Sequence, residues 1–175
     1  ISVVPGGVDL SMFRPLDVNE GRRKLGLNGE KLILYVGRIE PLKGLDLLCR
    51  ATAMLEVEEP FKVLIIGGDL ESESNVSQLK SLSQGLGIAD SLEFVGRMDR
   101  DTLPLYYSAA DVCVIPSYYE SFSLVALEAM ACGTPVIATD VGGLAQLVRE
   151  GETGFLVPGR DPHALGNRFQ LLLSE

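Results

Sequence analysis

The sequence contains few of the residues on which metal and nucleophile chemistry usually depend. It has one histidine, His163, and three cysteines in 175 residues. Cys49, Cys113 and Cys132 all lie in apolar segments, where a thiol behaves as a small hydrophobic side chain. Three dispersed cysteines cannot form a zinc site, and a lone histidine leaves a Ser-His-Asp triad incomplete. We therefore expect no metal, no disulfide framework and a reducing, cytoplasmic location.

Basic residues and long apolar runs are also scarce. Fifteen Lys and Arg face 24 Asp and Glu, and the net charge of -9 argues against nucleic acid and anionic membranes as partners. No apolar run approaches the roughly 18 residues of a membrane-spanning helix, and no secretory signal is recognisable. The motifs GxGxxG and GxxxxGK[ST] are absent, which argues against the dinucleotide and P-loop classes. An anionic ligand would have to meet a local positive site.

Short apolar runs alternate with helical patterns along the chain. The runs cover 32–38, 61–68, 92–97, 111–117, 135–140 and 154–159, and the helical patterns cover 44–55, 74–86, 101–109, 122–131, 144–149 and the residues from 162 onward. Uniformly apolar strands joined by helices are typical of a parallel sheet that is buried on both faces. The expected fold is α/β, a Rossmann-like, doubly wound parallel sheet of about six strands in one domain.

Two cations follow the first apolar run, where ligands of such sheets bind. Arg38 and Lys43 lie at the expected strand end and beside an expected helix start. Their charges and the unpaired amides of a helix start suit phosphate oxygens. The alternative is that both are solvated surface charges.

Two carboxylates belong to the segment after the fourth apolar run. Glu120 lies in the loop, where it could line a cleft or could simply be an acid favoured by the helix dipole. Glu128 lies eight positions later in an otherwise apolar stretch, and a buried carboxylate requires bonding partners or a cavity. A carboxylate matches the vicinal diol of a ribose, so Glu128 either holds a nucleoside or is a satisfied core residue. The pairs Gly67-Gly68 and Gly142-Gly143 are expected to form turns.

The segment ESFSLVALEAMACGTPVIATDVGGLAQLVREGETGFLV closely resembles the C-terminal, donor-binding half of group 1 (family 4) retaining GT-B glycosyltransferases. Its E-x7-E motif is Glu120 to Glu128, and the resemblance extends back through SAADVCVIPSYYE, SLEFVGRMDR, LYVGRIEPLKGLDLL and ISVVPGGVDLSMFRP. Within the family, the sequence of this segment is most similar to mycothiol-type N-acetylglucosaminyltransferases and to sucrose-phosphate-synthase-like members. The resemblance implies one half of a GT-B fold.

The resemblance also implies roles for individual residues. Arg38 and Lys43 match the pair that contacts the diphosphate, and Glu120 matches the acid that bonds hydroxyls of the donor sugar. Glu128 matches the ribose-binding acid. The other donor-binding positions that it implies are Gly37, Arg97, Met98, Ser121, Phe122, Ser123 and Leu124. Residues 97–98 would lie against the base, and the amides of 122–124 would approach the sugar and diphosphate.

The sequence departs from the family pattern at Ser123, where many members have Gly, and at Gln146, where many have Glu. By resemblance, residues 1–28 form a strand and interdomain connector and residues 29–175 the nucleotide-sugar-binding domain, while an N-terminal acceptor domain is absent from this chain. The implied function is transfer of a hexosyl group from a nucleotide diphosphate sugar, expected to be UDP-linked, to a hydroxyl acceptor without a metal or other cofactor. This chain alone would be inactive. The alternatives are a non-catalytic nucleotide-sugar-binding module and a sugar-nucleotide epimerase or phosphorylase of the same architecture.

Overall fold

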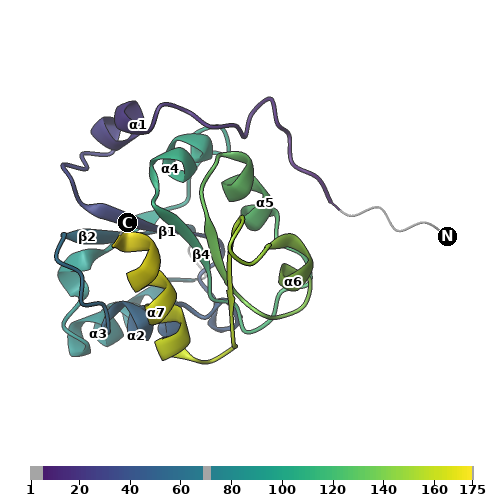
Figure 1. Cartoon of the computed structure of the whole chain (residues 1–175). Coiled ribbons are helices and arrows are strands. Elements are labelled where there is room, and N and C mark those ends of the chain that lie inside the picture. Colours follow the sequence, from purple (N-terminus) through teal and green to yellow (C-terminus); the bar gives the residue numbers. More distant parts are fainter. Residues whose placement is uncertain (1–5, 69–71, 175) are drawn as a thin grey trace.

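The computed structural model describes residues 6–68 and 72–174, and these form one layered α/β body (Figure 1). The strands are β1 (Lys31–Val36), β2 (Phe61–Ile66), β3 (Leu92–Gly96), β4 (Val112–Ile115), β5 (Val136–Thr139) and β6 (Gly154–Val157). The α-helices are α1 (Val18–Lys24), α2 (Leu45–Thr52), α3 (Glu73–Gly85), α4 (Leu103–Ala109), α5 (Leu124–Ala131), α6 (Leu144–Leu147) and α7 (Pro162–Leu173). The short 3-10 helices η1 (Pro41–Lys43) and η3 (Ala89–Ser91) lie between them.

The six strands form a single parallel sheet in the order β3-β2-β1-β4-β5-β6. Each connection that leads to a neighbouring strand passes through a helix, as a parallel sheet requires. The expectation of a doubly wound α/β sheet of about six strands is confirmed. The chain order changes direction at β1, which pairs with β2 on one side and with β4 on the other.

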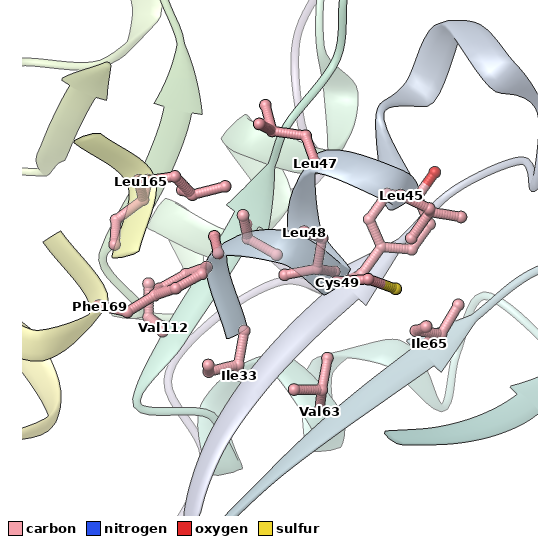
Figure 2. Close-up of a cluster of buried hydrophobic side chains, with 14 of the residues drawn as sticks. Ile33, Leu45, Leu47, Leu48, Cys49, Val63, Ile65, Val112, Leu165 and Phe169 are labelled. Atoms are coloured by element: carbon pink, nitrogen blue, oxygen red, sulfur yellow. The ribbon is translucent and has the colours of Figure 1, made fainter. Parts of the chain in front are cut away.

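Both faces of the sheet are covered by helices, and each face has its own apolar core. Helices α2, α3 and α7 cover one face, and α1, α4, α5 and α6 cover the other (Figure 1). Along β1, Ile33 and Tyr35 point into the first core, whereas Leu32 and Leu34 point into the second. Figure 2 shows part of the first core, where side chains of α2 and α7 meet those of β1, β2 and β4. This alternation explains why the strands are apolar without interruption.

The helix ends follow the local chemistry of the sequence. Asp161 caps α7 by accepting a hydrogen bond from the amide of Ala164, and Pro162 occupies the first turn. Gly133, in the left-handed region at φ 83°, follows the end of α5. Helix α2 ends at Thr52 rather than at 55, because the chain turns there and Leu55 packs back against the first core.

The N-terminal segment lies across the second face of the molecule. The strand expected at the start of the chain falls largely on residues 1–5, outside the described residues, and residues 6–9 have no regular structure. Helix α1 is capped by Asp17 and packs on α4. Between them, residues 9–16 run over α4 and the end of α5, where Leu16 donates its amide hydrogen to the hydroxyl of Ser108.

Candidate functional site

The point at which the strand order reverses lies between β1 and β4. In doubly wound sheets, ligands bind outside the carboxyl ends of the strands at this point. The loop after β1 carries Arg38 and Lys43, and the loop after β4 carries Glu120. Two of the cations and one of the acids singled out in the sequence therefore belong to the two loops that flank this crevice.

Lys43 and Glu120 join the two loops directly. The ammonium of Lys43 donates to Oε2 of Glu120 over 2.7 Å, and the two side chains are only 17% and 14% exposed. Lys43 ends η1 and is followed by Gly44 in the left-handed region at φ 67°, where an added Cβ would lie 1.9 Å from the carbonyl oxygen of Pro116. The glycine thus allows the loop after β1 to touch the backbone of the loop after β4. The same contact brings the lysine to its partner.

The turn after β5 contacts the backbone of Glu120. Gly142 has φ 52°, and a Cβ there would lie 1.8 Å from the backbone oxygen of Glu120. The amide of Gly143 donates to the same oxygen over 3.2 Å. The pair Gly142-Gly143 forms the turn expected from the sequence. It also fixes the main chain that presents the carboxylate of Glu120.

A cavity of about 650 Å³ runs along the carboxyl ends of β1, β2 and β3. Its described lining contains four of the expected donor-binding or catalytic residues, namely Gly37, Arg38, Arg97 and Met98. The other described lining residues are Val36, Ile39, Glu40, Ile66, Gly67, Gly68, Ser72, Asn75 and Leu103. Lys43, Glu120 and Glu128 are not among them. The expected site residues therefore do not all face one cavity: the four named above line it, and these three lie elsewhere.

Tyr35 supports the loop that carries Arg38. Its hydroxyl donates to the backbone oxygen of Arg38 over 2.7 Å. Burial is the main cause of the raised pKa of Tyr35, and the negative charges of Glu40 and Glu120 raise this pKa further. The tyrosine therefore remains a hydrogen-bond donor at neutral pH. The guanidinium of Arg38 is mostly exposed and pairs with Glu40 over 3.1 Å.

Glu128 lies in the second core, on the inner side of α5, and is 6% exposed. Its Oε1 accepts a hydrogen bond from the guanidinium of Arg100 over 3.0 Å, and its Oε2 accepts one from the hydroxyl of Tyr107 over 3.1 Å. Burial and the nearby Glu128 raise the pKa of Tyr107, so this hydroxyl keeps its proton. The carboxylate has the partners that its burial demands. An ionised carboxylate has about four acceptor sites, so two further hydrogen bonds from a ligand are compatible with these contacts.

The first residues of α5 explain one departure from the family pattern. Ser123 is the N-cap, and its hydroxyl accepts a hydrogen bond from the amide of Ala126 over 3.2 Å. Ser121 and Leu124 are exposed, and Phe122 is half-buried against Gly6. A serine here adds a cap that a glycine lacks. Gln146 is exposed on α6, and nothing in the structure explains this departure.

Sequence reasoning did not identify Arg100 and Tyr107 as neighbours of Glu128. They lie 28 and 21 positions away from it along the chain. The available signal was Arg100, which follows the same strand as Arg97 and is a further cation near the expected site. A second signal was Tyr107, because a tyrosine in an apolar helix usually requires a partner for its hydroxyl.

Metal ligation and reactive thiols have little support in the described part of the chain. Within residues 6–68 and 72–174, no cluster of three or more His, Cys, Asp or Glu side chains is arranged to hold a metal ion. The three cysteines are buried and free. Burial raises the pKa of Cys49 and that of Cys132 to about 11, so these thiols stay protonated at neutral pH. None of the helices in the same residues combines the length and apolar character needed to cross a lipid bilayer.

Comparison with known proteins shows the family of this chain. The family model described as "Glycosyl transferases group 1" matches residues 17–175. A curated relative, the D-inositol 3-phosphate glycosyltransferase of Acidothermus cellulolyticus, is 47% identical over 169 residues, which cover 93% of this chain and 38% of the relative. The chain spans about two fifths of the length of the curated relatives that it matches.

Solved structures share the fold. The sucrose-phosphate synthase of Thermosynechococcus elongatus has a TM-score of 0.89 and 43% identity, with 98% of this chain and 43% of that chain covered. The protein Alr3699/HepE of Anabaena, in complex with UDP and glucose, has a TM-score of 0.87 and 26% identity, with 97% of this chain and 46% of that chain covered.

Proposed function

This chain belongs to the group 1 glycosyl transferases, and on this basis we propose that it is the donor-binding part of a retaining glycosyltransferase. The donor is a nucleotide diphosphate sugar, with UDP as the nucleotide, and a hexosyl group passes from it to a hydroxyl of the acceptor. The choice of UDP is supported by the similar Anabaena protein, whose structure contains UDP and glucose. In this proposal an N-terminal domain outside this chain binds the acceptor.

The observation that carries the proposal is the shielded Lys43–Glu120 ion pair across the point where the strand order reverses. An ammonium has three donors, so Lys43 can keep its bond to Glu120 while it donates to phosphate oxygens. Arg38 adds a guanidinium at the edge of the adjacent cavity. The net charge of the chain is -9, and these cations provide the local positive site that a diphosphate requires.

The two carboxylates take different parts in binding the donor. Glu120 orients a hydroxyl of the sugar, because its carboxylate stands beside the cation that contacts the diphosphate. Glu128 binds the ribose diol with the acceptor sites that Arg100 and Tyr107 leave open. The base lies against residues 97–98, at the end of β3. The described cavity of about 650 Å³ is within the range of small-molecule sites.

Catalysis in this proposal rests on stabilising the leaving group. The bond between the anomeric carbon and the diphosphate oxygen breaks, and negative charge grows on the diphosphate. The acceptor oxygen bonds to the anomeric carbon from the same face, and its proton passes to the departing diphosphate oxygen. Lys43 and the amides at the start of α5 are held in place and need little reorganisation as this charge develops, and the exposed Arg38 adds a further cation. No metal or other cofactor takes part in the proposed reaction.

Nucleotide binding tests the proposal directly. Calorimetry on the chain with UDP, GDP, ADP and their sugar derivatives should show the tightest binding for the UDP series. If none of these ligands binds at millimolar concentration, the assignment is refuted. Donor hydrolysis by the full-length protein then separates a transferase from a non-catalytic nucleotide-sugar-binding module, since only the former breaks the glycosyl–phosphate bond.

A further inference from the structure

Phe13, from the N-terminal segment, contacts both side chains that hold Glu128. The guanidinium carbon of Arg100 lies 5.2 Å from the centre of its ring. The ring of Tyr107 meets it edge-on, with 6.1 Å between centroids and an interplanar angle of 61°. Phe13 itself is fully buried in the second core. One side chain thus supports two donors that converge on a single carboxylate.

We propose that Phe13 is a positioning residue for nucleotide binding, which acts by fixing Arg100 and Tyr107 so that the Glu128 carboxylate is presented in one orientation. This inference rests on the proposed function, because it assumes that Glu128 receives the ribose. It adds a residue far from the two acids in sequence, in a segment for which neither sequence pattern nor comparison indicated a role in the site.

Arg100 requires such support more than Tyr107 does. Its side chain is 57% exposed, whereas the carboxylate that it pairs with is 7% exposed. An exposed arginine has many rotamers, and a half-solvated ion pair alone holds it weakly. The attraction between the ring of Phe13 and the guanidinium favours the position from which Arg100 reaches Oε1 of Glu128.

The N-terminal segment is itself anchored at several points. Asp9 accepts the amides of Met12 and Phe13 with its backbone oxygen, over 3.2 and 2.8 Å, and this turn presents the phenyl ring to the core. Three residues farther on, the amide of Leu16 donates to the hydroxyl of Ser108, which directly follows Tyr107. The ring of Phe13 is therefore fixed relative to α4, the helix that carries Tyr107.

The test compares two fully buried phenylalanines, one in each core. Phe13→Leu keeps an apolar side chain but removes the ring face and edge, and Phe169→Leu makes the same change in α7, away from Glu128. UDP and 2′-deoxy-UDP are titrated against both variants and the unaltered chain by calorimetry. The ratio of the two affinities measures the contribution of the 2′-hydroxyl, and a general loss of stability does not change this ratio.

The expected result is that Phe13→Leu weakens UDP binding by roughly 5- to 20-fold, the scale of a weakened hydrogen bond to a charged group, and reduces the preference for UDP over 2′-deoxy-UDP. Phe169→Leu should retain that preference. In a Glu128→Gln background, Phe13→Leu should cause little further loss, because both changes act on the same contact.

Arg100→Gln tests the same link at an exposed side chain, without removing volume from the core. It should reduce the preference for the 2′-hydroxyl to a similar degree. Full retention of this preference in Arg100→Gln, or in a folded Phe13→Leu chain, would overturn the positioning role and leave the proposed function intact. An unaltered chain that binds no nucleotide would overturn both.

Discussion

Glu120 and Glu128 lie eight positions apart and are both shielded from water, yet their surroundings differ in kind. Glu120 is on a loop and pairs with one cation, Lys43, from the opposite side of the crevice. Glu128 is on a helix and has two partners, Arg100 and Tyr107, which are both supported by one aromatic ring. The first acid lies at the boundary between two loops, and the second lies within a core.

The two acids of the E-x7-E motif are therefore suited to different tasks. A single ion pair at the mouth of a crevice can share its lysine with an anion as charge develops on that anion. A buried carboxylate that already has two hydrogen-bond partners is preorganised and contributes to folding as well as to binding. Changes around Glu120 should therefore alter turnover, whereas changes around Glu128 should alter nucleotide affinity and stability. The following substitutions test this comparison.

Lys43→Ala should have the largest effect. In the full-length protein it should lower turnover by roughly 10²–10³-fold, the scale for loss of one electrostatic contact to a transition state. Lys31→Ala is the matched control, because Lys31 also pairs with a glutamate and is 19% exposed, but lies at the amino end of β1. Steady-state kinetics with a UDP-sugar measures both. Near-normal turnover in Lys43→Ala would show that Lys43 does not stabilise the leaving diphosphate.

Glu128→Gln should weaken UDP binding by about 1–3 kcal/mol, because the bonds that the carboxylate makes would lose their charge. Calorimetry with UDP measures the loss directly. The comparison predicts that this variant also unfolds at lower urea concentration, since Arg100 loses a charged partner. If affinity for UDP is unchanged, Glu128 is a core residue alone and the division of tasks fails.

Tyr107→Phe should lower the free energy of unfolding by roughly 1.5 kcal/mol, because the buried Glu128 loses one donor. The raised pKa of Tyr107 also makes a pH-dependent prediction. Below pH 10 the tyrosine is neutral in both the folded and the unfolded chain. Above pH 10 only the unfolded chain loses this proton, so stability falls by about 1.4 kcal/mol per pH unit from this residue. Urea unfolding between pH 8 and 11 should show a shallower decline in Tyr107→Phe than in the unaltered chain.

Ser123→Ala should have the smallest effect, a loss of about 1 kcal/mol in the free energy of unfolding, because α5 loses its cap. Ser123→Gly should cost only a few tenths of a kcal/mol, since glycine is tolerated at this position of a helix. Thermal unfolding of the two variants measures the stability of the helix separately from any effect on Glu120. An equal cost for both would show that the hydroxyl is not a functional cap.

The sequence predicted the α/β class, the six strand–helix units and the edge of the sheet where a site should lie. These follow from the apolar runs and from the helical patterns that alternate with them, which are local features of the sequence. It did not predict the strand order or the partners of Glu128. The rule that buried carboxylates need partners was sufficient to require neighbours for Glu128. The identity of Arg100 and Tyr107 depends on how α4 and the turn before it pack on α5.

The grouping of the site residues was also beyond the sequence. The sequence did not predict that Arg38 lines the cavity while Lys43 pairs with Glu120. The cause is the short 3-10 helix that ends at Lys43 and the contact of Gly44 with Pro116. Such a contact between two backbones depends on tertiary packing and leaves no periodic pattern in the sequence.

The turn at Gly142 has a consequence for how sequences of this kind can vary. It belongs to the strand–helix unit of β5, yet it presses on the main chain of the loop that follows β4. The conformation of the loop that carries Glu120 thus depends on the neighbouring strand–helix unit. If only one of these two strand–helix units were exchanged with that of a relative, the turn after β5 and the loop after β4 would no longer fit each other. The two units should therefore be exchanged together.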